Sequence, residues 1–364
     1  MNCVLVASRK IFETQTNIDA EENLKELESL AYTLSFDVKG KKILNLKKIN
    51  SSIYYGKGQI KSISSQLSSI KCDHIIFNDD ISPSQYKNIQ KILDKKIKIF
   101  DRTGVILEIF KKNAMTRESK LQVELASLQY MLPRLTGQWT HLERQMGGVG
   151  TRGGPGEKQI EIDRRLIGVR ISKLKKDLSN IKKNRTTQSS MRKNAFRISL
   201  VGYTNAGKSS MLNALTKPNT TYVKDKLFAT LDTTTKSLQI LKNKKVLITD
   251  TVGFIKDLPH NLVASFRSTF EEVDSSDLIL TIVDSSQNKA GIEEHIATIE
   301  TTLNQMGIKV QSNILIFNKL DLIKEPSSIR YFKKKYPDAI FVSAKNQIMI
   351  EKINHAIIAK ISEN

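Results

Sequence analysis

The hydrophobic pattern of the first hundred residues alternates between two periods. Short runs rich in β-branched residues, which are typical of buried strands, recur at residues 4–7, 38–46, 74–77 and 98–100. Between them, apolar residues with helical spacing predict helices at 21–34, 59–69, 83–93 and 103–110. Strands separated by helices favour a largely parallel sheet. The pattern therefore predicts a small α/β domain, which we place at residues 1–117.

The apolar pattern changes near Ser119 to that of long helices. Two apolar seams with helical spacing follow, one through Leu121, Leu125, Leu128 and Leu132 and one through Ile160, Ile167, Ile171, Leu174, Leu178 and Ile181. The stretch 147–156 between them holds six glycines and a proline, which excludes helix and strand. We therefore predict an antiparallel helical hairpin with a glycine-rich loop at residues 118–185 and a linker at 186–195.

From Phe196 the α/β pattern returns in a more apolar form. Continuous apolar runs predict strands at residues 197–201, 246–249, 278–284, 313–317 and 339–342, with helices between them and a last helix at 349–361. Strands this apolar are buried on both faces, as in a parallel sheet covered by helices. The sequence thus predicts a second α/β domain, with a mostly parallel sheet, at residues 196–364.

The distribution of charge favours a polyanionic partner. The formal net charge is +21, and residues 134–195 alone hold 15 basic against 5 acidic side chains. Neutralising phosphates releases counterions, so a concentrated positive segment attracts nucleic acid. A general drift of composition toward lysine is the alternative, but drift would not favour one segment.

Composition also bounds the setting. Cys3 and Cys72 are the only cysteines and show no metal-ligand or redox spacing, which favours a reducing compartment. No apolar run approaches the roughly 20 residues that cross a bilayer. The apolar start is followed by Arg9 and Lys10, which is the wrong order for a signal peptide. We expect a cytoplasmic monomer without integral membrane association.

The candidate chemistry begins with a phosphate-binding loop. The loop follows the strand predicted at 197–201, leads into a helix, and consists of Gly202, Tyr203, Thr204, Asn205, Ala206, Gly207, Lys208 and Ser209. Backbone N–H groups at the start of a helix bind phosphate oxygens. In this motif Lys208 is expected to reach the β- and γ-phosphates, and the Ser209 hydroxyl is expected to ligate Mg²⁺.

Further motifs complete a guanine-nucleotide site, and they are Asp250, Thr251, Val252 and Gly253, then Asn318, Lys319, Leu320 and Asp321, then Ser343, Ala344 and Lys345. Asp250 would hold Mg²⁺ through water, and the Gly253 N–H would sense the γ-phosphate. The Asp321 carboxylate can accept hydrogen bonds from guanine N1 and N2, which adenine does not offer. Lys319 would cover one face of the base, and the Ala344 N–H would bond guanine O6. The motifs together predict a GTPase that converts GTP to GDP and phosphate.

The switch segments leave two questions open. Four threonines, any of which could complete the Mg²⁺ coordination, are Thr230, Thr233, Thr234 and Thr235, and spacing does not choose among them. Phe254 stands where Ras-like enzymes place the glutamine that orients the attacking water, so slow intrinsic turnover is expected, with help from a partner, an ion or another residue. Asn205 either supports a potassium ion beside the phosphates or stabilises the turn with its amide.

The chain resembles HflX-type GTPases, ribosome-associated members of the P-loop GTPase class, over almost its full length. The stretches that carry the resemblance beyond the nucleotide motifs are DRTG at 101–104, KLQVELA at 120–126, LPRL at 132–135, GVGTRGGPGE at 148–157 and DRR at 163–165. Switch I matches as well, with Phe228, Ala229, Thr230, Leu231 and Asp232. By that match Thr230 joins Ser209 as a Mg²⁺ ligand, and Lys208, Thr230 and Gly253 are expected to act in catalysis. The implied fold is a C-terminal P-loop GTPase domain preceded by an α/β domain and a helical hairpin.

The resemblance also implies a partner. It implies binding to rRNA of the large (50S) ribosomal subunit, with the N-terminal region reaching toward the peptidyl-transferase centre, and a role in splitting or rescuing stalled ribosomes. Candidate phosphate contacts in the basic segment are Arg134, Arg144, Arg152, Arg164 and Arg165. Trp139 is either a base-stacking group or an interdomain packing residue. Many relatives carry an additional C-terminal domain, whereas this chain stops with the helix predicted at 349–361.

Two other classes of function compete with this one. An RNA-binding or ribosome-assembly scaffold, in which nucleotide is mainly structural, would bind ribosomes equally with GTP or GDP. A membrane-linked signalling GTPase is disfavoured because the sequence shows no anchor and no basic amphipathic terminus.

Overall fold

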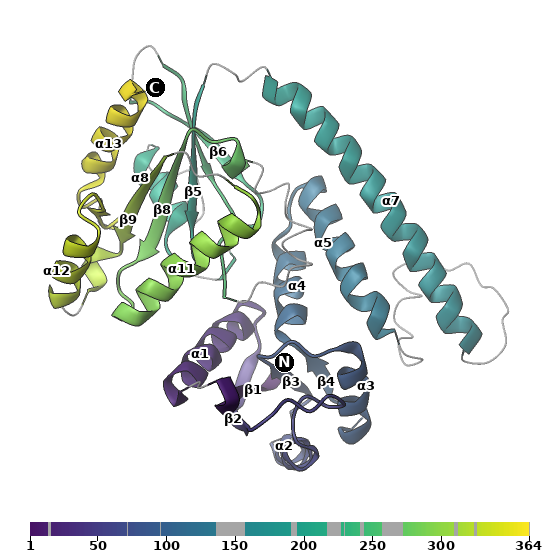
Figure 1. The fold of residues 1–364 in the computed structure, drawn as a ribbon. Coiled ribbons are helices and arrows are strands. Elements are labelled where there is room, and N and C mark those ends of the chain that lie inside the picture. Colours follow the sequence, from purple (N-terminus) through teal and green to yellow (C-terminus); the bar gives the residue numbers. More distant parts are fainter. Residues whose placement is uncertain are drawn as a thin grey trace. The chain divides into compact units, whose positions relative to one another are not determined.

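The computed structural model forms two compact units (Figure 1). The described residues are 1–13, 16–70, 72–94, 96–135, 157–190, 195–216, 227–228, 230–240, 244–256, 272–308, 312–323 and 326–363. The first unit comprises residues 1–112 and 121–178, and the second comprises residues 113–120 and 179–364. Helix α5 (Arg117–Met131) and helix α7 (Glu157–Ser190) therefore each run from one unit into the other.

The first unit is built on a four-stranded parallel sheet in the order β2-β1-β3-β4. Its strands are β1 (Asn2–Lys10), β2 (Asp37–Leu46), β3 (His74–Phe77) and β4 (Lys98–Phe100). Its helical elements before α5 are η1 (Ile11–Glu13), α1 (Asn17–Thr33), α2 (Lys57–Ser69), α3 (Pro83–Ile92) and α4 (Arg102–Asn113), and η2 (Leu132–Arg134) follows α5. The alternation of strands and helices predicted from the sequence is confirmed.

Local signals in the sequence explain where two of these helices begin. Thr16 and Asp19 exchange side-chain and backbone hydrogen bonds, which forms a capping box at the start of α1. Ser82 and Gln85 do the same before α3, where Pro83 occupies the first helical position. In both helices the cap side chain therefore accepts from the N–H of the third helical residue, and the side chain of that residue accepts from the N–H of the cap.

The two helices of the predicted hairpin pack together within the first unit. Leu125 of α5 shares a buried apolar cluster with Ile167 and Leu174 of α7, as the two apolar seams predict. Arg170 of α7 donates two hydrogen bonds, of 2.6 and 2.8 Å, to the Glu124 carboxylate of α5. The paired charges and the apolar seam together hold α7 against α5.

Helix α7 is longer than predicted, because it continues through Ser190 into the segment 186–195 that is predicted as a linker. No glycine or proline follows Gly168 before residue 190, so nothing in this polar stretch breaks the helix. The glycine-rich stretch 147–156 lies outside the described residues.

The second unit is built on a six-stranded sheet in the order β10-β9-β8-β5-β7-β6. Its strands are β5 (Phe196–Gly202), β6 (Thr234–Leu238), β7 (Val246–Asp250), β8 (Leu278–Asp284), β9 (Asn313–Asn318) and β10 (Ile340–Phe341). Its helical elements are α8 (Lys208–Leu215), α11 (Lys289–Gln305), η3 (Leu320–Leu322), α12 (Pro326–Lys335) and α13 (Ile350–Glu363). The five predicted strands are confirmed and pair in parallel. The antiparallel β6 is not predicted, because it is polar and buries only Leu238.

The sheet of the second unit brings the sequence motifs to one edge. The P-loop follows β5, the Asp250 motif ends β7, and the Asn318 motif ends β9. Because the carboxyl ends of parallel strands lie at the same edge of the sheet, residues far apart in sequence converge there. The buried strands beneath, packed against α8 and α13, form the core that holds this edge in place.

Candidate active site

The phosphate-binding loop between β5 and α8 buries its lysine. Lys208 is 6% exposed, and its Nζ donates to the carbonyl oxygens of Gly202 and Tyr203 at 3.1 and 3.0 Å. Burial lowers the pKa of Lys208 to about 8, although the nearby Asp250 carboxylate acts in the opposite direction. The loop thus places an ammonium group beside the N-terminus of α8, whose dipole also favours anionic phosphate.

Two glycines of the site leave no room for a side chain. Gly207 has a φ of +93°, and a Cβ there would lie 2.3 Å from Asn318 Nδ2. A Cβ on Gly253 would lie 2.8 Å from Thr204 Cα and 2.9 Å from Lys208 Nζ. The P-loop therefore packs directly against the guanine motif, residues 318–321, and against residues 250–253, where switch II begins.

The residues predicted to hold Mg²⁺ lie together and fit it. The hydroxyl oxygens of Ser209 and Thr230 are 2.8 Å apart, and the Asp250 carboxylate accepts from them at 2.6 and 3.2 Å. Adjacent oxygen ligands of octahedral Mg²⁺, each about 2.0–2.1 Å from the ion, lie about 3 Å apart. Asp250 Oδ1 is buried and has no hydrogen-bond partner among the described residues, which suits a bond to a metal-bound water. Burial raises the pKa of Asp250, and the Lys208 ammonium opposes this rise.

The geometry supports Thr230 among the four candidate threonines. Thr234 and Thr235 lie in β6, and the Thr235 hydroxyl is 2.9 Å from that of Thr249. Thr230 is therefore the candidate whose hydroxyl the structure places beside Ser209.

Asn318 joins the guanine motif to the P-loop. Its side-chain amide donates to Ala206 O at 2.9 Å and accepts from Ala344 N at 3.0 Å. The Ala344 N–H, predicted to bond guanine O6, is thus donated to Asn318 instead. A bond from Ala344 to the base stays a prediction, and it requires that N–H to be shared.

The residues predicted to recognise the guanine base lie close to Asn318 in the sequence or in the structure. Asp321 is exposed, and its Oδ1 accepts from the Ser343 hydroxyl at 2.5 Å. Lys319 has a φ of +63° and forms an ion pair of 2.7 Å with Asp284, a residue at the end of β8 that belongs to none of the sequence motifs. The other predicted members near the site are buried Thr251 and Val252, buried Phe228 and Leu231, half-buried Leu320, and exposed Lys345.

The start of switch II is bonded to the P-loop through its backbone. Phe254 N donates to Gly202 O at 3.0 Å, and Thr204 N donates to Phe254 O at 2.7 Å. The Phe254 side chain is 1% exposed. Its burial supports the prediction that this residue does not orient the attacking water.

Tyr203 has a role that the sequence does not indicate. Its ring stacks on His295 of α11, with centroids 3.8 Å apart and planes 11° from parallel. Its hydroxyl accepts from Lys256 N at 2.7 Å, and Lys256 Nζ forms an ion pair with Glu294 of α11. The P-loop, switch II and α11 are thereby linked through one side chain whose partners carry no recognisable motif.

Asn205 has left-handed backbone geometry, with a φ of +60°, and is exposed. Its amide makes no hydrogen bond with the residues that the structure describes. The described residues therefore offer no hydrogen bond that would support the interpretation of Asn205 as a turn-stabilising amide.

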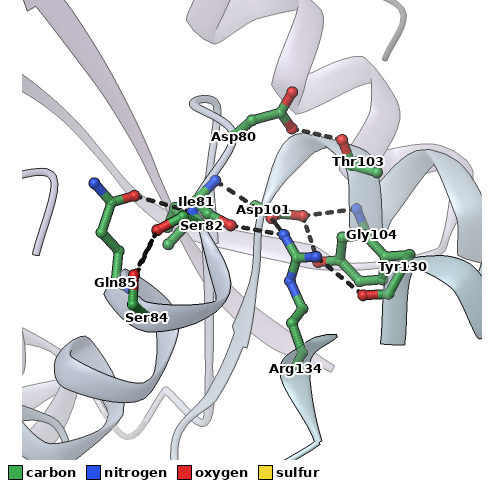
Figure 2. A network of polar contacts seen from close by, with 10 residues as sticks. All are labelled: Asp80, Ile81, Ser82, Ser84, Gln85, Asp101, Thr103, Gly104, Tyr130 and Arg134. Carbon is green, nitrogen blue, oxygen red and sulfur yellow. Dashed lines mark hydrogen bonds and ion pairs between the residues drawn. The ribbon is translucent and has the colours of Figure 1, made fainter. Parts of the chain in front are cut away.

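Arg134, a predicted rRNA contact, is bound inside the first unit (Figure 2). Its guanidinium donates to Asp101 Oδ2 at 3.1 Å and to the carbonyl oxygens of Ile81 and Tyr130 at 2.6 and 3.0 Å. The side chain is only 12% exposed, so its geometry does not support contact with phosphate. Arg164 and Arg165 are exposed on α7, as rRNA contact requires. The predicted residues outside the described part of the chain are Arg144, Arg152, Trp139 and Ala229.

Family models match three consecutive parts of the chain. Residues 21–111 match "GTP-binding GTPase N-terminal", residues 113–192 match "GTP-binding GTPase Middle Region", and residues 197–319 match "50S ribosome-binding GTPase". The matches agree with the nucleotide motifs and cover the α/β domain and the hairpin as well.

Relatives and a solved structure give the same result. GTPase HflX of Magnetococcus marinus is 42% identical over 332 residues, which cover 91% of this chain and 76% of the relative. GTPase HflX of Escherichia coli is 35% identical over 345 residues, which cover 94% and 79%. The "crystal structure of SsGBP and GDP complex" matches with a TM-score of 0.53 and 25% identity, and the match covers 100% of this chain and 99% of that one. The chain therefore belongs to the HflX family of P-loop GTPases, which hydrolyse GTP.

Proposed function

We propose that this GTPase binds the large ribosomal subunit and that GTP hydrolysis gates its binding and release. The observation that carries the proposal is the match of residues 197–319 to a family of 50S ribosome-binding GTPases. In such a cycle the γ-phosphate orders the switch segments, and hydrolysis releases them. Splitting or rescue of stalled ribosomes, protein synthesis and ribosome biogenesis are the processes in which such a cycle operates.

The exposed basic face of α7 supports rRNA as the contact. The helix carries ten Lys and Arg against four Asp and Glu. Arg164 and Arg165 are exposed near its first turns, whereas Arg170 is engaged by Glu124. Exposed arginines bind phosphate with little reorganisation, and binding of this kind weakens as salt displaces the released counterions.

The conditions for hydrolysis also belong to the proposal. Mg²⁺ is to be held by Ser209 and Thr230, with Asp250 acting through water. A potassium ion beside the phosphates, supported by Asn205, is to supply help that Phe254 cannot give. We further propose a monomer that acts in the cytoplasm, where ribosomes are found. None of the described helices is long and apolar enough to span a membrane.

The test is the GTPase rate with and without purified large subunits. We expect large subunits to raise the rate well above the intrinsic one, and we expect Arg164→Ala combined with Arg165→Ala to lose most of this stimulation while keeping the intrinsic rate. The matched control is Lys333→Ala with Lys334→Ala, which removes the same charge from exposed positions of α12. Absence of stimulation at physiological salt would contradict the proposal. Co-sedimentation that is equal with GDP and a non-hydrolysable GTP analogue would favour a scaffold instead.

A further inference from the structure

Switch I is held from both sides of Thr230 by the segment that leads into α5. Asn113 Nδ2 donates to Phe228 O at 2.8 Å. Two residues after Thr230, the Asp232 carboxylate accepts from Met115 N at 2.7 Å and from Thr116 N at 3.2 Å, and it also accepts from the Thr116 hydroxyl. All of these residues belong to the second unit, although Thr116 and Asp232 are 116 residues apart in the sequence.

The contacts with Asp232 have the character of a strong anchor. The carboxylate faces backbone N–H groups at the N-terminus of α5, where a negative charge is favoured by the helix dipole. Burial would raise the pKa of Asp232, but the hydrogen bonds from Thr116 and Met115 bring it below its ordinary value. The Thr116 hydroxyl also accepts from Ser119 N at 3.2 Å, as an N-cap of α5 does. Thr116 therefore joins the first turn of α5 to the switch.

Thr230 lies between these two anchors and faces the nucleotide side. Its hydroxyl is 2.8 Å from Ser209 Oγ and 3.2 Å from Asp250 Oδ2. Its neighbour Leu231 is buried, at 2% exposure, and so is Phe228. The backbone at Thr230 is thus fixed by apolar burial and by hydrogen bonds on both sides, which restricts where its hydroxyl can point.

We propose that Asn113 and Thr116 are positioning residues for GTP hydrolysis, because they hold Phe228 and Asp232 and so aim the Thr230 hydroxyl at the Mg²⁺ position beside Ser209. Neither residue touches the nucleotide site itself. Because switch I is released after hydrolysis, Thr230 is expected to coordinate Mg²⁺ only while GTP is bound. Asn113 and Thr116 should therefore affect the GTP-bound state and not the GDP-bound state.

The same anchor links the state of switch I to the start of α5. Helix α5 begins at switch I and continues to Leu125 and Leu128, which pack against α7. If the contacts of Met115 and Thr116 with Asp232 stabilise the ordered form of switch I, then ordering of switch I must, by linkage, stabilise these contacts to the same extent. Binding of a non-hydrolysable GTP analogue is therefore expected to protect the amides of Met115 and Thr116 from hydrogen exchange more than binding of GDP does.

The proposal is tested with Thr116→Val, which keeps the shape of the side chain and removes the hydroxyl. We expect the single-turnover rate of GTP hydrolysis, and the affinity for a non-hydrolysable GTP analogue, each to fall about tenfold, the scale of one hydrogen bond to a charged group. The affinity for GDP stays at the wild-type value. Thr116→Ser restores both quantities, and Asn113→Leu, which removes the bond to Phe228 O, reproduces the loss.

Thr103→Val is the matched control, since it removes a hydroxyl that donates to Asp80 in the first unit. It is expected to leave hydrolysis and both nucleotide affinities unchanged. Wild-type hydrolysis in Thr116→Val and Asn113→Leu would overturn the proposal. A parallel loss of affinity for GDP and for the GTP analogue would also overturn it, because it would show that these residues only stabilise the fold.

Discussion

Both sheets of the molecule carry polar side chains at the edge where their parallel strands end, and the two edges use them differently. In α/β proteins this edge is where ligands bind, most often at the point where the strand order reverses. In the first unit, the order β2-β1-β3-β4 places that point between β1 and β3. In the second unit, the P-loop and the residues predicted to hold Mg²⁺ lie at this edge.

The edge of the first unit is closed by its own side chains. Asp79, which follows β3, accepts hydrogen bonds of 2.6, 2.8 and 2.9 Å from the hydroxyls of Ser8, Tyr54 and Tyr55. Two buried tyrosines from the segment between β2 and α2 thus hydrogen-bond to the residue that follows β3. A ligand would have to displace side chains that are already hydrogen-bonded.

Asp101, after β4, is satisfied in the same way (Figure 2). One carboxylate oxygen accepts from Gly104 N at 2.8 Å and from the Tyr130 hydroxyl at 2.6 Å. The other accepts from Arg134 at 3.1 Å and from Ile81 N at 3.4 Å. Burial raises the pKa of Tyr130 well above its ordinary value, and the Asp101 charge adds to this. The arrangement ties η2 to the sheet.

The edge of the second unit keeps charges whose burial the protein compensates only in part. The Lys208 ammonium is buried against carbonyl oxygens, and Asp250 Oδ1 has no partner among the described residues. Their pKa values move in opposite directions, down for Lys208 and up for Asp250, because burial disfavours both charges. The comparison indicates that carboxylates whose oxygens are hydrogen-bonded within the protein, as in Asp79 and Asp101, stabilise the fold. Asp250 Oδ1, which has no partner among the described residues, lies instead at the candidate nucleotide site.

The largest effect should come from Lys208→Met, which keeps the stem and removes the charge. We expect GTP hydrolysis to fall about 1000-fold, as for loss of a group that stabilises the transition state. The unfolding temperature without nucleotide should not fall, since the buried ammonium is disfavoured in the fold. Single-turnover hydrolysis and thermal unfolding test this, with Lys244→Met as the control. A clear loss of stability in Lys208→Met would break the comparison.

The opposite result is expected for Asp101→Asn. Removing this charge leaves Arg134 buried without its counter-ion, a change that typically costs about 3–5 kcal/mol. Hydrogen exchange of the β1 and β3 amides measures the loss as a lower free energy of opening, while the intrinsic rate of GTP hydrolysis stays at wild type. Asp37→Asn, at an exposed ion pair with Lys39, is the matched control and should change little. Unchanged exchange in Asp101→Asn would show that this edge is not held by the network.

The residues that the structure gathers at the edge of the second unit could be named from the sequence for a physical reason. Phosphate, Mg²⁺ and guanine have fixed shapes and charges, so the residues that bind them recur at fixed distances from strand ends. Gly207 and Gly253 are required by direct packing, which a short motif can record. The parallel strands of both sheets are likewise predicted, because most of them are apolar runs that reflect burial beneath helices, whereas the polar, antiparallel β6 is not predicted.

The closed edge and the anchors of the switch could not be predicted in this way. Arg134 reads as a phosphate contact because a basic segment surrounds it, yet its partner Asp101 lies on another element. The bond from Thr116 to Asp232 joins positions 116 residues apart, and neither residue belongs to a spaced motif. Polar side chains acquire their role from tertiary neighbours, which a single sequence does not display.

A smaller effect is expected from pH on nucleotide affinity at the edge of the second unit. The pKa of Lys208 is about 8 in the nucleotide-free site, and phosphate raises it again on binding. Below pH 8 the lysine is protonated before and after binding, so the affinity is flat. Above that value a proton must be taken up, and the affinity for a non-hydrolysable GTP analogue should be about tenfold weaker at pH 9 than at pH 7. Lys208→Arg stays charged and should lose this slope; an equal slope in the variant would assign the effect to another group.

The smallest effects compare two glycines in helices. A Cβ at Gly168 of α7 meets nothing within 4 Å, so Gly168→Ala should raise the free energy of unfolding by about 0.5–1 kcal/mol through the loss of backbone entropy in the unfolded chain. A Cβ at Gly104 of α4 would lie 3.0 Å from the Tyr130 hydroxyl and 3.2 Å from Asp101 Oδ1. At Gly104 the added Cβ would push the Tyr130 hydroxyl and the Asp101 carboxylate out of their hydrogen-bonded positions. This cost opposes the gain in entropy, so Gly104→Ala should not stabilise the protein. Urea unfolding of both variants measures the difference. An equal gain at both positions would mean that the network around Asp101 and Tyr130 can accommodate an added methyl group. In that case the hydrogen bonds of the network, and not its tight packing, would be what excludes a ligand from this edge.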